Sequence, residues 1–527
     1  MPDRPTIFAL SSGRPPVAIA VIRISGPRAG AALTTLGVKI PAPRKAGLAR
    51  IRDPRSGEII DEALVLWFPA PHSETGEDVA ELQAHGGRAV IAAILDALAQ
   101  IDGLRMAEAG EFTRRGFENG KLDLTAVEGL ADLVGAETEG QRRQAFRQMK
   151  GLLGNRAETW RKRLIQALAL VEARIDFSDE ADVPEDLVAP ALAIARELKA
   201  EIAAALADGH RGERLREGLV VAIAGPPNAG KSTLLNRIAR REAAIVSPYA
   251  GTTRDVVEVH LDLGGLPVTL LDTAGIRDTD DPVELEGVRR ARERAASADL
   301  VLWVVDASAA EAAAGLEAAG GAAGRNQPAA AGSHSIEGEG PLGRPNRVWL
   351  VRNKIDLLKQ GLSRSEPDIS GDCKSEREIS INKPLIDIVD IGLTHKNEPG
   401  LRFNEGLRGV INVSLLSKAE EAFSINDYTF NLSADSGEGF DALLAQLRRH
   451  AEDYLSGGEQ SLVSRARHRT ALEATLAALQ RAEAVANAED FLAEELRTAA
   501  HALGRLTGRV DVEDVLDVIF RDFCIGK

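Results

Sequence analysis

The chain has 527 residues, of which 44% are hydrophobic, and its formal net charge is −15. This length predicts roughly three domains, and the negative charge argues against a protein coated for nonspecific nucleic-acid binding. The sequence has no apolar run of the ~18 residues that a membrane span needs, its first residues lack the apolar core of a signal peptide, and its two cysteines exclude a disulfide framework. We therefore expect a cytoplasmic protein with no membrane partner.

Residues 1–121 predict an α+β domain. Apolar stretches typical of strands lie at residues 17–24 and 62–68, and residues 89–99 have the pattern of a helix.

Residues 122–218 are predicted to be helical. Val127, Leu130, Leu133 and Val134 recur at the spacing of one helix face, and strand-forming residues are few.

The simplest architecture is an all-α domain built from two segments, residues 122–218 and 450–527, with a nucleotide-binding domain at residues 219–449 inserted between them. The ends of an inserted domain lie close together, so such an arrangement is tolerated. We expect a multidomain fold in which a Ras-like P-loop α/β domain interrupts the helical domain and the α+β domain precedes both.

Residues 225–232 read Gly-Pro-Pro-Asn-Ala-Gly-Lys-Ser, the spacing of a phosphate-binding loop. The apolar run at residues 219–224 predicts a buried strand before it, and residues 233–238 predict a helix after it. The glycines allow backbone N–H groups to converge on phosphate oxygens, and the helix N-terminus adds its dipole. We expect Lys231 to reach the β- and γ-phosphates and the Ser232 hydroxyl to hold Mg²⁺.

Two later tetrapeptides fit the magnesium side of such a site. Asp272-Thr-Ala-Gly275 follows the strand pattern at residues 268–271, so its carboxylate can hold the magnesium shell while Gly275 leaves room near the γ-phosphate. Gly-Thr-Thr-Arg at residues 251–254 lies where a switch threonine, here Thr253, closes on Mg²⁺.

Two further motifs select guanine. Asn353-Lys-Ile-Asp356 follows an apolar strand, and an aspartate there accepts two hydrogen bonds from the guanine N1–H and exocyclic amine, which adenine cannot offer. Ser433 and Ala434 follow another strand pattern and fit the loop whose backbone N–H meets guanine O6. The nucleotide is therefore predicted to be GTP.

The usual catalytic glutamine is missing. Ras-like switches carry it just after the D-x-x-G glycine, and this chain has Ile276, whose apolar side chain cannot orient water. We expect GTP hydrolysis to be assisted instead by another cation near the phosphates or by an acid in residues 278–286. For most of residues 278–286, however, a mobile solvated loop is the alternative interpretation.

Two segments and the tail are unusual. Residues 307–347 are rich in Ala and Gly and predict part helix, part flexible linker. Residues 357–426 exceed what this region of a GTPase requires, so we expect a helix near one end and disorder around 363–383. The tail at residues 523–527 carries a thiol close to a lysine, with ordinary helix capping as the alternative.

In order along the chain come a T-I-x-A-L segment, an I-R-I-S-G strand, the G-P-P-N-A-G-K-S loop and a terminal C-x-G-K. This order resembles the MnmE (TrmE) tRNA-modification GTPases over nearly the whole chain. Further matching motifs are Thr75-Gly-Glu-Asp78, Glu81 to Gly87, Gly110-Glu-Phe112 and Lys121-Leu-Asp-Leu124.

The resemblance implies a homodimer whose N-terminal domain binds a tetrahydrofolate derivative of the 5-formyl or 5,10-methylene type. The matching residues are Arg23, Glu81, Lys121 and Lys527. The folate's glutamate tail needs cations, and its pterin needs a carboxylate such as Glu81. On the residues alone, Arg23 and Lys121 are more often solvated surface charges.

The resemblance also implies K⁺ in the nucleotide site, where it would offset negative charge on the leaving oxygens. Its matching ligands are Asn228, Ser247, Tyr249 and Thr252, and Glu284 matches a catalytic, water-orienting acid. With these included, the residues expected to bind GTP are Asn228, Ala229, Gly230, Lys231, Ser232, Thr233, Ser247, Thr252, Thr253, Asp272, Thr273, Ala274, Gly275, Asn353, Lys354, Asp356, Ser433 and Ala434.

The implied output is a carboxymethylaminomethyl or aminomethyl group at C5 of the tRNA wobble uridine, made in a heterotetramer with an FAD-dependent MnmG-type partner. Cys524 is a hypothetical catalytic thiol. A basic run suits tRNA phosphates, although a solvated helix face is the default interpretation; it comprises Arg142, Arg143, Arg147, Lys150 and residues 161–163.

Other classes of protein remain open on the residues. Ribosome-assembly GTPase switches share the nucleotide-binding core and bind RNA without one-carbon chemistry, but they have no reason to keep folate-type motifs and a C-x-G-K tail. A nucleotide-binding scaffold with little turnover would be favoured if K⁺ did not stimulate hydrolysis.

Overall fold

The computed structural model describes residues 4–176, 186–226, 228–242, 244–245, 258–272, 298–308, 347–357, 428–510 and 526. Most of the two unusual segments, and the predictions made for them, lie outside these residues. Packing divides the chain into two compact units: Met1–Leu219, Asp262–Pro267 and Ala451–Lys527 form the first, and Val220–Leu261 and Val268–His450 form the second.

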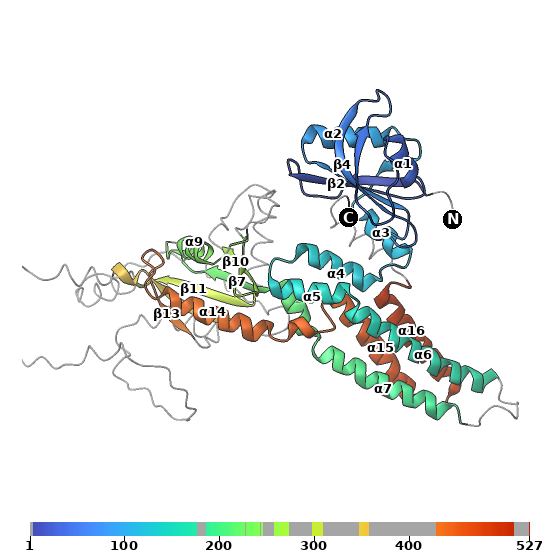
Figure 1. The fold of residues 1–527 in the computed structure, drawn as a ribbon. Helices are drawn as coiled ribbons and strands as arrows, with labels where there is room; N and C mark the ends of the chain where they lie inside the picture. The colour runs from blue at the N-terminus through green and yellow to red at the C-terminus, as the bar shows by residue number, and fades with distance from the viewer. Residues whose placement is uncertain are drawn as a thin grey trace, which may run out of the picture. The chain divides into compact units, whose positions relative to one another are not determined.

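The first unit begins with six strands, β1 (Thr6–Leu10), β2 (Ile19–Ser25), β3 (Gly47–Arg52), β4 (Ile59–Phe68), β5 (Val79–His85) and β6 (Leu104–Met106). They form one sheet in the order β3-β4-β5-β2-β1-β6, antiparallel except for the β1–β6 pair (Figure 1). The helices of this region are α1 (Ala29–Thr35), α2 (Arg88–Ala99) and α3 (Glu111–Glu118).

Side chains of β1 alternate between the two faces of this sheet, as strand geometry requires. Phe8 is fully buried in the main core of the domain, which includes Leu33 of α1. Ile7 belongs instead to a second cluster with Phe112 of α3. Apolar side chains thus line both faces of β1.

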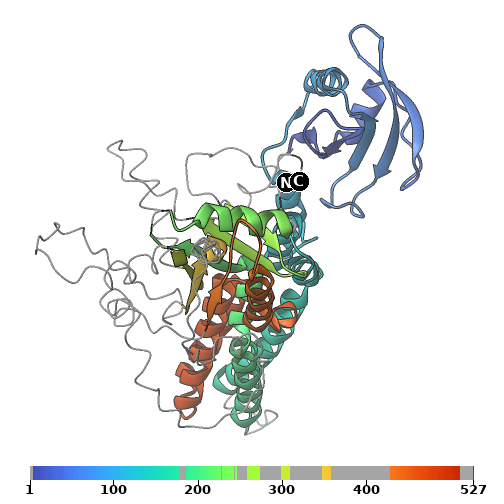
Figure 2. The same cartoon turned by 90° about the vertical axis from the view of Figure 1, so that its left-hand side faces the viewer.

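The other described elements of the first unit are helical: α4 (Leu124–Gly135), α5 (Glu139–Met149), α6 (Leu152–Asp176), α7 (Val188–Ala207), α8 (Gly209–Glu217), the 3-10 turn η3 (Gly458–Gln460), α15 (Ala466–Ala484) and α16 (Glu489–Thr507). Helices α6, α7, α15 and α16 lie side by side (Figure 2). Trp160 of α6, Leu198 of α7, Leu472 of α15 and Leu496 of α16 are buried in one core. One helical domain is therefore built from two distant segments.

The second unit contains a seven-stranded sheet. Its strands are β7 (Leu219–Ala224), β8 (Ala244–Ile245), β9 (Glu258–Asp262), β10 (Pro267–Asp272), β11 (Leu300–Asp306), β12 (Arg347–Asn353) and β13 (Thr429–Asn431), and its described helices are α9 (Lys231–Arg241) and α14 (Phe440–Leu455). The strand order is β13-β12-β11-β7-β10-β9-β8. Because β7, β11, β12 and β13 are parallel, their carboxyl ends share one edge, where ligands bind in such folds.

The predicted fold class, a P-loop domain inserted into a discontinuous helical domain behind an α+β domain, is confirmed. Two strands extend further than predicted: β12 continues past residue 351 to Asn353, and β10 continues past residue 271 to Asp272. Among the described helices, none combines the length and apolar character that a bilayer crossing requires.

Candidate active site

The phosphate loop joins β7 to α9. Gly225 has a φ of +139°, and a Cβ there would collide with the carbonyl oxygen of Val304 on β11, so only glycine fits this close approach. Lys231 begins α9, and its Nζ donates to the carbonyl oxygens of Gly225 and Pro226 at 2.9 Å each. The ammonium group therefore lies within the loop that is predicted to receive phosphates.

Ser232 and Asp272 meet beside this loop. The Ser232 hydroxyl donates to Oδ2 of Asp272 at 2.9 Å, and Asp272 is buried at the end of β10. Hydroxyl and carboxylate oxygens are the ligands that Mg²⁺ prefers. These two side chains therefore fit the predicted magnesium site, whereas Thr253 lies outside the described residues.

Asn353 joins the phosphate loop to the loop at Ser433 and Ala434 that is predicted to contact guanine, called the guanine loop below. Its Nδ2 donates to the carbonyl oxygen of Ala229 at 2.8 Å, and its Oδ1 accepts from the backbone N–H of Ala434 at 2.8 Å. The side chain is buried, so both hydrogen bonds are shielded from water. The residue predicted beside guanine thus also fixes the spacing between two loops.

Lys354 is anchored by a residue that the motif does not reveal. It has a φ of +67°, and its Nζ donates to Oδ2 of Asp306 at 2.6 Å. Burial raises the pKa of Asp306, but hydrogen bonds from Lys354 and Ser308 outweigh it and hold the pKa below the ordinary value. The available signal in the sequence was the acid that ends the apolar run of β11. Asp356, which is predicted to pair with guanine, is half-buried two residues after Lys354.

Asn228 adopts the left-handed backbone conformation in the phosphate loop, with a φ of +62°. Non-glycine residues seldom adopt this conformation, and Asn tolerates it better than most. The four-residue stretch from Gly225 to Asn228 thus includes two residues with positive φ, which bends the loop tightly.

In the N-terminal domain, Arg23 and Glu81 are direct cross-strand partners in the β2–β5 register. Nε and Nη2 of Arg23 donate to Oε1 of Glu81 at 3.0 and 2.9 Å, while Nη1 lies 2.9 Å from Oε2 of Glu74. Lys121 lies beside Gly76, in the same loop as Glu74. Three of the four residues predicted to bind folate therefore lie near the start of β5 and the loop that precedes it.

Two of the family-type motifs meet at Arg115, which is buried. Its guanidinium lies 3.0 Å from Oε2 of Glu77 and 3.0 Å from Oε1 of Glu111. Burial raises the pKa of Glu111, but hydrogen bonds from Arg105, the Glu108 backbone and Arg115 outweigh it and keep the carboxylate ionised. Sequence reasoning missed Arg115, which ties the Thr75–Asp78 loop to α3.

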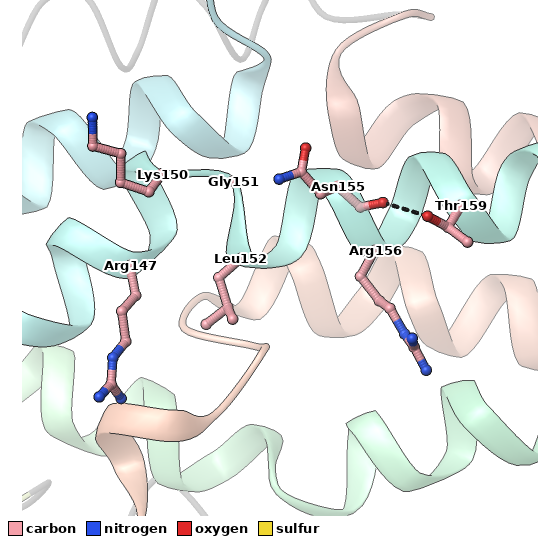
Figure 3. Close-up of a pocket in the computed structure, with 7 residues that line it drawn as sticks. All are labelled: Arg147, Lys150, Gly151, Leu152, Asn155, Arg156 and Thr159. Carbon is pink, nitrogen blue, oxygen red and sulfur yellow. Dashed lines mark hydrogen bonds between the residues drawn. The ribbon is translucent and has the colours of Figure 1, made fainter.

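Part of the basic run predicted for tRNA is paired with acids. Arg142 and Arg143 both pair with Glu139, whose pKa they lower to about 2. Arg163 pairs with Glu197 and Glu201. A shallow pocket of about 470 Å³ lies between α5 and α6, but Figure 3 shows Lys150 pointing away from Arg147 and Arg156, so these cations do not converge on one anion.

The remaining predicted site residues lie outside the part of the chain that the structure describes, so their positions stay predictions. They are Ser247, Tyr249, Thr252, Thr253, Thr273, Ala274, Gly275, Glu284, Cys524 and Lys527; Ile276, which stands where the glutamine is missing, lies outside this part as well. Of the others, Gly230 precedes α9, Thr233 lies exposed in its first turn, and Ser433 is fully buried beside Ala434.

Comparison with known protein families gives matches to the N-terminal domain and to the remainder of the chain. The family described as "GTP-binding protein TrmE N-terminus" matches residues 6–121, and the family described as "MnmE helical domain" matches residues 124–524.

Relatives that carry the name "tRNA modification GTPase MnmE" include three that match along the whole chain. Those from Bradyrhizobium sp. strains BTAi1 and ORS 278 are each 52% identical over 527 residues, and that from Rhodopseudomonas palustris strain CGA009 is 50% identical over 526 residues. Each alignment covers 100% of this chain and 100% of the relative.

Proposed function

The chain belongs to the MnmE (TrmE) family of tRNA-modification GTPases, and from this membership we propose that it couples GTP hydrolysis to modification of the tRNA wobble uridine. The product carries a carboxymethylaminomethyl or aminomethyl group at C5, with a tetrahydrofolate derivative as one-carbon donor. The observation that carries the proposal is the Asn353 bridge between the phosphate and guanine loops, on a chain that also holds the Arg23–Glu81 pair.

In the nucleotide site, Asp356 would accept hydrogen bonds from the guanine N1–H and exocyclic amine, and a backbone N–H of the loop at Ser433 and Ala434 would meet O6. Lys231 would exchange its two carbonyl partners for phosphate oxygens, to which an ammonium group bonds more strongly. This exchange needs only a small movement, because Nζ already lies within the loop.

Two cations would complete this site and offset negative charge on the phosphate oxygens. Ser232 and Thr253 would hold Mg²⁺, supported by the hydroxyl–carboxylate contact between Ser232 and Asp272. Asn228, Ser247, Tyr249 and Thr252 would hold K⁺, and Glu284 would orient the attacking water in place of the missing glutamine.

In the N-terminal domain, Glu81 would pair with N–H groups of the pterin, while Arg23, Lys121 and Lys527 would supply cations for the folate's carboxylates. Cys524 would lie beside this chemistry as a candidate thiol. The active assembly would be a homodimer joined to an FAD-dependent MnmG-type partner, with tRNA as the substrate that both proteins share in the cytoplasm.

The experiment that tests this function is GTP turnover by the purified chain in KCl and in NaCl at equal ionic strength. We expect at least about tenfold faster turnover in KCl, since one well-placed charge contributes this much or more to catalysis. Equal rates would contradict the cation mechanism, and absence of turnover in both salts would favour a nucleotide-binding scaffold.

A further inference from the structure

Arg237, on the helix that follows the phosphate loop, donates hydrogen bonds to the backbone of the guanine loop. Its Nη1 donates to the carbonyl oxygens of Ala434 and Asp435 at 2.7 and 2.5 Å. A Cβ placed on Gly437, whose φ is +92°, would collide with Nη2, so the guanidinium group lies directly against this loop. The guanidinium carbon also lies 5.8 Å from the ring centroid of Phe440.

These contacts complete a closed set of connections between the phosphate loop, Asn353, the guanine loop and α9. The phosphate loop bonds to Asn353 through the Ala229 carbonyl, Asn353 bonds to the Ala434 N–H, and the Ala434 carbonyl bonds to Arg237. Helix α9 returns the connection from Arg237 to the phosphate loop. The loop is thus held at the N–H of Ala434 and at two successive carbonyl groups.

We propose that Arg237 is a positioning residue for guanine recognition, which aims the backbone N–H of Asp435 at O6 of the base; the N–H groups of Ser433 and Ala434 already donate to the Glu438 carbonyl and to Asn353. In a planar trans peptide the C=O and N–H point in opposite directions, so fixing the Ala434 carbonyl also fixes the Asp435 N–H. A guanidinium group suits this role because its rigid fork of donors always keeps its charge. The inference rests on the proposed function, since it takes a guanine nucleotide as the ligand.

Arg241 provides a matched control on the same helix. Its guanidinium carbon also lies 5.8 Å from the Phe440 ring centroid, but its ion pair is with Asp441 rather than with the loop carbonyls. Arg237→Met and Arg241→Met therefore remove the same charge and a similar ring contact, but only Arg237→Met removes the hydrogen bonds to the guanine-loop carbonyls.

The test measures dissociation constants of GDP and 6-thio-GDP for the full chain and both variants. In 6-thio-GDP the N1–H and exocyclic amine remain, while the oxygen at position 6 is replaced by sulfur, a weaker acceptor. We expect Arg237→Met to weaken GDP binding by about tenfold, as loss of charge-assisted hydrogen bonds does. It should weaken 6-thio-GDP binding much less, so that the preference for GDP shrinks severalfold.

Arg241→Met should leave both constants and their ratio unchanged. Equal weakening of both nucleotides by Arg237→Met would overturn the inference, because a purely structural role does not distinguish oxygen from sulfur. Unchanged binding in Arg237→Met would overturn it as well. If the unaltered chain failed to bind GDP, the proposed function itself would fall, which separates the two failures.

Discussion

The hydroxyl of Ser11 donates a 2.7 Å hydrogen bond to the carbonyl oxygen of Gly526, a residue 515 positions later in the chain. Gly526 has a φ of +101°, and a Cβ there would collide with the carbonyl oxygen of Leu10, the last residue of β1. Gly526 therefore fits against the end of β1 only as glycine. This contact holds a point near the end of the chain against the N-terminal domain.

Gly526→Ala should impair wobble-uridine modification without affecting GTP turnover, because it displaces the tail from β1 and leaves the nucleotide site intact. We expect the modification rate to fall about tenfold, since the alanine Cβ would collide with the Leu10 carbonyl oxygen and alanine disfavours a positive φ. Ser11→Ala loses one hydrogen bond of about 1 kcal/mol and should cost at most roughly fivefold. The readout is the modified nucleoside in tRNA after reconstitution with folate and the FAD-dependent partner. Normal modification by Gly526→Ala would show that the tail position does not matter.

Glu81→Gln should weaken binding of tetrahydrofolate derivatives by at least about tenfold, because it removes a charged acceptor from a half-buried site. GTP turnover should stay unchanged. Glu62→Gln is the matched control, since Arg50 and Glu62 form another cross-strand pair of the same sheet but are both exposed. Titration calorimetry with 5-formyltetrahydrofolate measures the effect. Similar affinities for Glu81→Gln and Glu62→Gln would remove Glu81 from the folate site.

Asn228→Gly should abolish most of the potassium stimulation while retaining nucleotide affinity. Glycine adopts the φ of +62° at no cost, so only the amide side chain is lost. Asn228→Ala removes the same amide but adds about 1 kcal/mol of backbone strain, and should therefore also bind GDP more weakly. The measurement is the ratio of GTP turnover in KCl to that in NaCl. A ratio in Asn228→Gly equal to that of the unaltered chain would exclude this side chain as a ligand.

The parts of the site that could be predicted from the sequence are those formed by short motifs of neighbouring residues. Spacing alone singled out Lys231 and Ser232 at the start of the helix that follows the phosphate loop, and Asp272 at the end of a strand. It could not reveal Arg237 against Ala434 or Ser11 against Gly526, since these contacts join segments that only the tertiary fold brings together.

Electrostatic pairing explains the other differences. Arg23 could equally have been a solvated surface charge, until the β2–β5 register placed it opposite Glu81. Arg142 and Arg143 appeared free for phosphates, yet one helical turn brings Glu139 to both. A residue's charge can be read from sequence, but its partner depends on register and packing.

A buried cluster in the helical domain predicts how stability changes with pH. Glu128 of α4 and His468 of α15 are both buried, and His468 Nε2 lies 2.6 Å from Oε2 of Glu128. Arg467 also donates to both oxygens of Glu128. His468 Nδ1 has no hydrogen-bond partner among the described residues, which fits a neutral ring that donates from Nε2.

Folding lowers the pKa of both groups. Burial lowers the pKa of His468 from its ordinary 6.5, and Glu128 only partly opposes this. Burial raises the pKa of Glu128, but His468 and Arg467 outweigh it and hold the pKa far below its ordinary 4.5. The unfolded chain therefore binds more protons than the folded chain in acid, so the free energy of unfolding falls as pH drops below 6.5 and falls further below 4.5.

His468→Gln should flatten the first part of this acid dependence, because glutamine keeps a donor for Glu128 but does not titrate. Glu128→Gln should destabilise the helical domain by about 2–4 kcal/mol at pH 7, since it leaves the Arg467 charge without its carboxylate. Scanning calorimetry of the full chain between pH 5 and 8 tests both, and the transition that Glu128→Gln shifts identifies the helical domain. If that transition kept its full pH dependence in His468→Gln, protonation of His468 would not be the cause, and the acid sensitivity would have to come from other groups.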